Sequence, residues 1–240
     1  MLKQIIFSVL IITTVSSCHS FFGNRVHGNG NVITETRSAG NFTGIDVSGA
    51  VDVYITQDNS FSVKVETDEN LQQYIITEVR GDNVLRIKQE DNTSLETTRL
   101  KVYVSAPLYK GIEISGACKV YGQNDLTNPE GIDIDMSGAS KLVLNVNSPK
   151  VNAGLSGASY AELGGQTKEL ILDGSGSSDF KCFNLIAENV SVGISGAGNA
   201  EVSASVKLDV EVSGAANIKY KGNPAIDQNI SGAGSVKRMD

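Results

Sequence analysis

The sequence lacks tryptophan and has only 4 prolines, 2 histidines and 3 cysteines among its 240 residues. Both histidines, His19 and His27, lie near the N-terminus, so the chain has no pattern for a histidine-based metal site. With 7 Tyr and 7 Phe as its only aromatic residues, it gives weak support to an aromatic platform for sugars. Glycine, by contrast, is abundant at 25 residues. This composition favours short strands joined by tight turns.

Residues 1–17 have the pattern of a signal peptide. Lys3 supplies a positive charge, and the apolar stretch from Ile5 to Val15 is shorter than the ~20 residues that span a bilayer. The stretch leads into Val15-Ser16-Ser17-Cys18, which resembles a bacterial lipobox. We therefore expect cleavage before Cys18, lipid attachment to Cys18 and a tether over residues 18–30. The alternative is an ordinary signal peptide with an incidental cysteine.

The charge of the chain is acidic. Cleavage would remove Lys3 as the only charged residue, so the net charge of −7 would become −8. The chain also has no basic patch, which argues against nucleic acid as a partner. Because anionic lipid would repel such a chain weakly, its acyl chains must hold it at the membrane.

A Ser-Gly-Ala triplet, once varied to Ser-Gly-Ser, recurs eight times. The first gap between triplets is long, and the later triplets follow one another at nearly constant spacing. Apolar and polar residues alternate on both sides of each triplet, as in β-strands, and glycine suits the corner between them. The triplets begin at Ser48, Ser115, Ser137, Ser156, Ser175, Ser195, Ser213 and Ser231.

The later triplets define a unit of about 18–22 residues, and a unit that turns and returns to the same place is one coil of a β-helix, stacked at ~4.8 Å on its neighbours. We predict an all-β fold, a single-stranded parallel β-helix of about seven coils. The variable unit length and the right-handed preference of parallel crossovers favour right-handed winding. Cys118 and Cys182 follow triplets three coils apart, roughly 14 Å at that spacing. A disulfide needs Cα atoms within about 7 Å, so we predict two free, buried thiols.

We interpret residues 31–240 as one domain, in which residues 51–105 interrupt the repeat. This insert contains three strand-like stretches, and Asp68 to Leu71 resemble the start of a helix. A solenoid end exposes unpaired backbone and needs a cap. We therefore predict a strand-rich N-terminal cap that contains one short helix.

An acidic stripe is the strongest candidate for a site. Acidic residues recur two and four positions before the triplet serines, where the alternation of the strands places side chains outward. Such a stripe could bind Ca²⁺ or act on polysaccharides, but outward positions on a strand must in any case be polar. The other templates for catalysis are absent, and we expect no cofactor, no metal and no catalytic residue. The candidate residues are Asp133, Asp135, Asp173, Asp209 and Glu211.

Several segments resemble the head-GIN-domain family of putative auto-transporter adhesins, over about residues 30–235. They are Phe42 to Val47, Val51 to Gln57, Val65 to Leu71 and the Ser-Gly-Ala coils. The resemblance implies a parallel β-helical fold and an envelope location, and it supplies no catalytic residues. Surface-bound lipoproteins of such bacteria often have acidic residues after the cysteine. Here His19-Ser20-Phe21-Phe22 follow instead, which favours an outer-membrane anchor that faces the periplasm.

We therefore expect a non-enzymatic binding or scaffold module of the cell envelope, resembling an adhesin. The membrane is one partner, through the lipid, and the other is an envelope protein, a glycan or a second copy of the chain. The alternative is a Ca²⁺-dependent or polysaccharide-active enzyme that uses the acidic stripe. A third hypothesis, a lipid-binding or assembly factor, would need an apolar groove that the sequence does not indicate.

Overall fold

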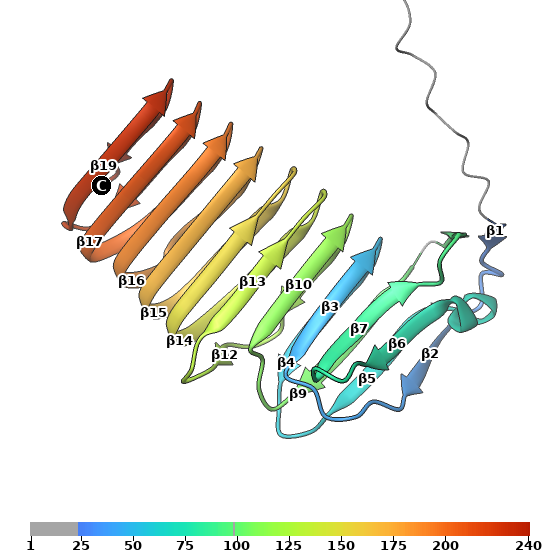
Figure 1. The fold of residues 1–240 in the computed structure, drawn as a ribbon. Helices are drawn as coiled ribbons and strands as arrows, with labels where there is room; N and C mark the ends of the chain where they lie inside the picture. The colour runs from blue at the N-terminus through green and yellow to red at the C-terminus, as the bar shows by residue number, and fades with distance from the viewer. Residues whose placement is uncertain (1–23, 98) are drawn as a thin grey trace, which may run out of the picture.

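The computed structural model describes residues 24–97 and 99–240, and in this part of the chain β-strands wind into a solenoid (Figure 1). The strand pairings join 18 strands into one continuous sheet. It folds into two broad sides of stacked, mostly parallel strands, which we call the first and the second sheet. This architecture confirms the predicted all-β parallel β-helix of about seven coils, with a strand-rich N-terminal cap and one short helix. Cys18 and the predicted signal peptide lie outside the described residues.

The first sheet runs the length of the solenoid, and its strands stack in register. Glu113, for example, pairs with Asp46 on one side and with Asp135 on the other. In spatial order its strands are β7 (Val84–Gln89), β3 (Gly44–Gly49), β10 (Gly111–Gly116), β13 (Ile132–Met136), the later halves of β14 (Lys141–Leu155), β15 (Tyr160–Gly176), β16 (Asp179–Gly196) and β17 (Asn199–Gly214), and β19 (Ala225–Gly232).

The second sheet lies on the other side of the core and begins after each Ser-Gly-Ala corner. The same long strands β14 to β17 contribute their first halves to it, because each of them bends around the solenoid. The short β12 (Leu126–Thr127) pairs with the middle of β14. The remaining strands of the second sheet are β9 (Lys101–Ala106), β4 (Asp52–Gln57), β11 (Lys119–Gly122), β18 (Asn217–Lys221) and β20 (Ser235–Arg238).

The triplet glycines form a ladder along one corner of the solenoid. Gly157 has φ +75°, and a Cβ on it would lie 2.6 Å from the carbonyl oxygen of Gly138 in the preceding coil. The next residue, Ala158, donates its N–H to that same oxygen at 2.8 Å. Only glycine therefore allows both the left-handed backbone and the close stacking of successive coils.

Small polar residues occupy one buried column inside this corner. The hydroxyls of Ser140, Ser159 and Ser178 each donate a hydrogen bond to the carbonyl oxygen three residues earlier, at 2.8–2.9 Å. Cys118 takes the equivalent place in its coil, with its Sγ 3.3 Å from the carbonyl oxygen of Ser115. Both Cys118 and Cys182 are buried and free, which confirms the prediction made from the coil spacing.

The insert between β4 and β10 builds the cap by doubling back. Strand β7 pairs with β3 and β9 pairs with β4, so both extend the two sheets on the N-terminal side of the first coil. Strand β10 then pairs with the opposite edge of β3 and starts the regular stack. The remaining elements of the cap are antiparallel or helical: β2 (Val32–Arg37), β5 (Ser62–Asp68), β6 (Ile75–Val79) and the 3₁₀ helix η1 (Glu69–Tyr74).

Residues 24–31, at the end of the expected tether, contact this cap. Strand β1 (Asn24–His27) pairs with β8 (Thr93–Glu96). The N–H of Gly30 donates to Asp68 Oδ1 at 2.7 Å, and the N–H of Asn29 donates to Asn70 Oδ1 at 2.9 Å. In the described part of the chain, no helix has the length and apolar character of a membrane span.

Candidate functional site: a groove on the first sheet

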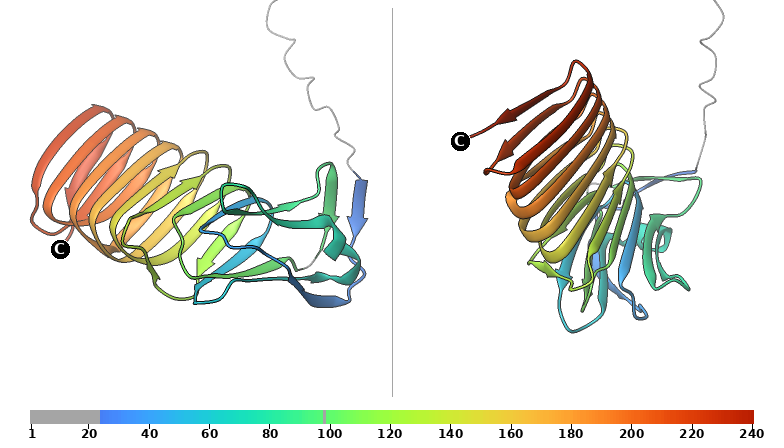
Figure 2. Two further views of the ribbon diagram at one scale, coloured as in Figure 1. Left: turned by 60° about the horizontal axis from the view of Figure 1, so that its bottom comes forward. Right: turned by 60° about the vertical axis from the view of Figure 1, so that its left-hand side comes forward.

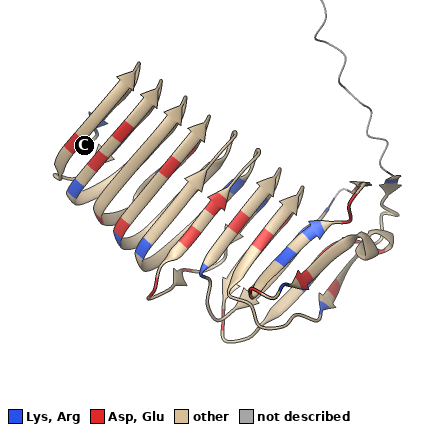
Figure 3. Ribbon diagram, viewed as in Figure 1, with Lys and Arg blue, Asp and Glu red and all other residues tan. Residues whose placement is uncertain are grey.

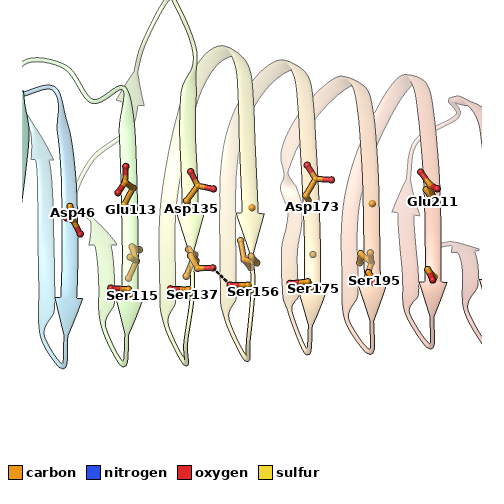
Figure 4. Close-up of a pocket in the computed structure, with 18 residues that line it drawn as sticks. Asp46, Glu113, Ser115, Asp135, Ser137, Ser156, Asp173, Ser175, Ser195 and Glu211 are labelled. Atoms are coloured by element: carbon orange, nitrogen blue, oxygen red, sulfur yellow. Dashed lines mark hydrogen bonds between the residues drawn. The ribbon is translucent and has the colours of Figure 1, made fainter. Parts of the chain in front are cut away.

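An open groove of about 830 Å³ lies on the outer face of the first sheet, beside the Ser-Gly-Ala corner. Its lining residues belong to strands from β3 to β17, and Figure 3 marks the acidic residues of these strands in red. Two parallel rows of residues line it, one acidic and one of serines, and Figure 4 shows both rows running across the strands. The residues between the rows, which also line the groove, are apolar or glycine: Ile114, Met136, Leu155, Gly174 and Ile194. The groove is built by repetition, because each coil adds one residue to each row.

The acidic row alternates with glycine over its C-terminal half. Along the stack, the paired positions read Asp135, Gly154, Asp173, Gly193 and Glu211. A Cβ at Gly154 would lie 2.9 Å from Asp135 Oδ1, and one at Gly193 would lie 2.9 Å from Asp173 Oδ1. Each aspartate carboxylate therefore occupies space above the glycine of the next coil. Like charges directly opposite one another destabilise a sheet, and the alternation separates them by two coils, or ~9.6 Å.

Three acids stand in adjacent coils at the N-terminal end of the row. Of these, Asp46 is compensated by the cap: its Oδ2 lies 3.5 Å from both Arg80 Nη1 and Arg86 Nε. Within residues 24–97 and 99–240, its neighbours Glu113 and Asp135 have no ion pair. The groove is therefore balanced in charge where it meets the cap and negative along the rest of its length.

The serine row was missed by sequence reasoning, which treated the triplet only as a corner. Its members are outward-facing residues two positions after the acidic row. The strand alternation that identified the acidic row could have identified this one too, because residues two apart share a face. Ser156 Oγ donates to the carbonyl oxygen of Met136 at 3.2 Å. The row comprises Ser115, Ser137, Ser156, Ser175, Ser195 and Ser213.

The five predicted site residues divide into two sets. Asp135 on β13, Asp173 on β15 and Glu211 on β17 line the groove. Asp133 and Asp209 lie two residues farther from the corner on the same outer face, outside the groove lining. Asp133 accepts a hydrogen bond from Asn152 Nδ2 at 2.6 Å, and Asp209 accepts one from Lys207 Nζ at 2.7 Å. A binding role for any of the five stays a prediction.

The groove carboxylates are arranged in a line and do not converge on a point. Hydrolysis of a glycosidic bond uses two carboxyl groups that flank one bond, and a Ca²⁺ site uses six or more oxygens around one centre. Among the described residues, no group of three or more His, Cys, Asp or Glu side chains could hold a metal ion. The arrangement suits repeated weak contacts with an extended partner better than chemistry at one place.

The outer face of the second sheet carries a different feature, a stack of three tyrosines. Tyr54 lies between Tyr103 and Tyr121, with ring centroids 5.2 and 5.5 Å away. Tyr103 donates its hydroxyl to Glu66 Oε2 at 3.0 Å. Because the central ring faces its two neighbours, the stack offers mainly ring edges to solvent, and we assign it to packing between strands.

Solved structures share this fold. A "putative adhesin" from Bacteroides fragilis matches with a TM-score of 0.85 and 24% identity, covering 89% of this chain and 100% of its own. A "putative adhesin" from Parabacteroides distasonis matches with a TM-score of 0.75 and 26% identity, covering 90% of this chain and 100% of its own. A "putative lipid binding protein" from the same organism matches with a TM-score of 0.73 and 23% identity, with the same coverage.

The search of curated proteins found no match. A family model does match, over residues 41–224, and that range includes the first coil, the cap insert and the groove from β3 to β17. The chain therefore belongs to the family described as putative auto-transporter adhesin, head GIN domain.

Proposed function

We propose that the chain is an exported, lipid-anchored binding or scaffold module of the cell envelope, without catalytic activity, and that it contacts its partner through the groove of the first sheet. The main observation behind this proposal is that one chemical pattern repeats in every coil from β10 to β17. In each of these coils a carboxylate or a glycine lies two residues before a serine, on the same face of the strand. Membership of the adhesin-like family supports an envelope location and a binding role.

The dimensions of the groove favour an extended partner. It crosses seven strands, so its length is about 29 Å at the ~4.8 Å spacing of strands. Its uncompensated carboxylates favour a segment that carries positive charge, and the serine hydroxyls can exchange hydrogen bonds with amide or sugar groups. An envelope protein segment or a glycan with amino groups has this chemistry.

Two alternatives predict other surfaces. A Ca²⁺-dependent or polysaccharide-active enzyme would use convergent carboxylates, and the groove places them in a row. A lipid-binding factor would need an apolar concavity free of ionised groups. Apolar residues such as Ile114 and Met136 do line this groove, but five carboxylates stand along one of its sides. We therefore favour the binding module over both.

The lipid anchor can be tested by itself. Cys18→Ala should move the full chain from the membrane fraction to the soluble fraction of the cells that produce it, because the acyl chains supply the attachment. The unchanged chain, processed in parallel, is the control. Continued membrane association of the Cys18→Ala chain would refute the anchor.

The groove can be tested with a matched pair of double variants in the full chain. Asp135→Asn with Asp173→Asn removes two groove carboxylates, and Asp133→Asn with Asp209→Asn removes two carboxylates of the same face outside the groove. We expect retention on cationic peptides and amino-sugar glycans to fall only for the first pair, and to weaken with salt. Equal loss in both pairs would refute the groove as the contact surface. Glycan cleavage that the first pair abolishes would refute the non-enzymatic role.

A further inference from the structure

The C-terminal end of the solenoid exposes an unpaired coil. In the described part of the chain, β19 pairs only with β17 and β20 pairs only with β18 (Figure 2). The inward position occupied by Leu208 in one coil is occupied by Ile226 in the next, and exposure rises from 0% to 43%. Ile230 and Val236 are likewise only partly buried. The last described coil therefore keeps apolar residues at two inward positions of β19, Ile226 and Ile230, while the polar Gln228 takes the place of Val210 between them.

The two ends of the solenoid differ. At the N-terminal end, the antiparallel strands of the cap and η1 follow the outermost strands β7 and β9 (Figure 2). Head-to-tail stacking of copies would need a parallel coil at both ends, and the cap ends in the antiparallel strands β2 and β6 instead, which disfavours filaments. A parallel coil that is open at one end only can be covered by the same end of a second copy, in a two-fold arrangement.

The open edge of β19 has backbone N–H and C=O groups that could pair with a second copy. Its neighbour Ala233 donates its N–H to the carbonyl oxygen of Gly214, so odd-numbered residues face β17. By the alternation of a strand, the N–H and C=O groups of Ile226, Gln228 and Ile230 face the open edge. Unpaired edges of this kind are templates for pairing with another chain.

We propose that two copies of the chain associate through their C-terminal ends, with β19 of one copy antiparallel to β19 of the other and Gln228 opposite its own counterpart. This register overlaps almost all of the eight residues of β19. On the inward side, it places Ile226 opposite Ile230 of the second copy, which matches apolar with apolar. On the outward side, it places Asp227 opposite Asn229.

Other registers match less well. A two-fold axis at Asp227 would place two carboxylates opposite one another, which is unfavourable. An axis at Asn229 would place Gln228 opposite Ile230 and would leave Ile226 opposite Gly232. Only the axis at Gln228 combines an overlap of seven of the eight residues of β19, apolar contact and the absence of like charges, and it makes the amide of Gln228 its own hydrogen-bonding partner.

The dimer goes beyond the proposed binding function and does not depend on it. Continuing the first sheet through β19 would place the two grooves on one continuous face, and an extended partner could then engage both. An unchanged chain that is monomeric but still binds its partner would reject only the dimer. An unchanged chain that forms the dimer but does not bind through the groove would reject only the groove.

Cysteine cross-linking in cells that produce the full chain tests the register. In an antiparallel hydrogen-bonded pair, opposite Cα atoms are about 5.5 Å apart, which suits a disulfide. Gln228→Cys should therefore convert to a disulfide-linked dimer under mild oxidation. Asn184→Cys, an exposed position on β16, should stay monomeric and controls for collisions. Equal cross-linking of the two variants, or none in either, would overturn the proposed register.

A charge exchange at the same residue tests the dimer without a covalent bond. The purified full chain should sediment at twice its monomer mass. Gln228→Lys and Gln228→Glu, each alone, should weaken self-association on the order of tenfold or more, because like charges then face one another. An equimolar mixture of the two variants should restore the dimer. A monomeric unchanged chain would overturn the proposal and would indicate that another molecule covers this end. Variants that associate as well as the unchanged chain would also overturn it.

Discussion

Replacing Gly157 by alanine should separate backbone strain from steric exclusion at the solenoid corner. Alanine at φ +75° costs roughly 1–2 kcal/mol relative to glycine. Its Cβ would also lie 2.6 Å from the carbonyl oxygen of Gly138, so the coils must move apart. That movement weakens the two ladder hydrogen bonds at 2.8 Å, from Ala158 to Gly138 and from Ser177 to Gly157. At about 1 kcal/mol each, the total loss is about 3–4 kcal/mol.

Two nearby glycines are matched controls: Gly131, in the preceding coil, and Gly154, on the strand that leads into the same corner. Gly131 has φ +129°, but a Cβ there would meet nothing closer than 3.5 Å, so Gly131→Ala should show strain alone, about 1–2 kcal/mol. A Cβ at Gly154 would contact only the carboxylate of Asp135, whose side chain can move, so Gly154→Ala should change stability by less than about 1 kcal/mol. Urea unfolding followed by circular dichroism measures all three.

The test is the order of the urea midpoints of unfolding, which should be lowest for Gly157→Ala, higher for Gly131→Ala and highest for Gly154→Ala. If Gly157→Ala and Gly131→Ala lose the same stability, close stacking does not limit the corner. A change of the denaturant slope between variants would instead show that some coils unfold separately, as repeat proteins allow.

Three further predictions concern buried groups of the core and cap. Burial raises the pKa of Cys182 to about 12 and raises that of Cys118, so neither thiol should react with a thiol reagent at pH 8 until the chain is denatured; rapid labelling of the native chain would contradict their burial. Cys118→Ser should change the unfolding free energy by less than about 1 kcal/mol, because serine occupies this column in other coils and can donate to Ser115; a loss of several kcal/mol in urea unfolding would argue against that equivalence. Hydrogen bonds from Thr97 and from the N–H of Gly30 hold the pKa of Asp68 below its ordinary 3.8, so this stabilisation is complete above that pH and is lost as the pH falls through the lower folded value. The protection of residues 28–31 against hydrogen exchange, taken relative to the intrinsic exchange rate at each pH, should therefore fall in acid, and Asp68→Asn should lower it at neutral pH. Unchanged protection in that variant would remove Asp68 as the contact that holds the segment.

The regular part of the fold was predictable because its signals are local and repeated. Each triplet marks a corner, and alternation then decides which residues face inward. The pairing of Glu113 with Asp46 spans the whole cap insert, yet it follows from aligning the two triplets without any structure. Periodic sequence fixes register here because a shift by one residue would expose a whole apolar column.

The cap was predictable as a composition but not as a topology. Its strands and a short helical turn are visible in the sequence, yet nothing local shows that β7 and β9 return to the far side of the first coil. Long-range pairing also decides the site. The contacts of Arg80 and Arg86 with Asp46 depend on this return, so the charge balance at that end of the groove could not be read from spacing.

The groove itself was half predictable. Counting residues before each serine identified the acidic row, and Asp135, Asp173 and Glu211 do line the groove. The same counting also selected Asp133 and Asp209, because alternation places them on the same face. It could not show that the concave part of that face ends nearer the corner, since concavity depends on how the coils stack.

Within the triplet, the fold and the proposed binding surface belong to adjacent residues of one motif. The glycine permits the coils to stack, and the serine before it lines the groove in each coil from β10 to β17. The length of the groove is therefore set by the number of coils, while its chemistry can change at the serine and at the acidic position without loss of the corner. A glycine substitution should alter both stability and binding, whereas substitution of a serine whose hydroxyl makes no hydrogen bond among the described residues, such as Ser175, should alter binding alone. This separation allows a solenoid to keep its architecture while its outer rows adapt to a different partner, so the acidic and serine rows, rather than the coil pattern, are where specificity must be sought.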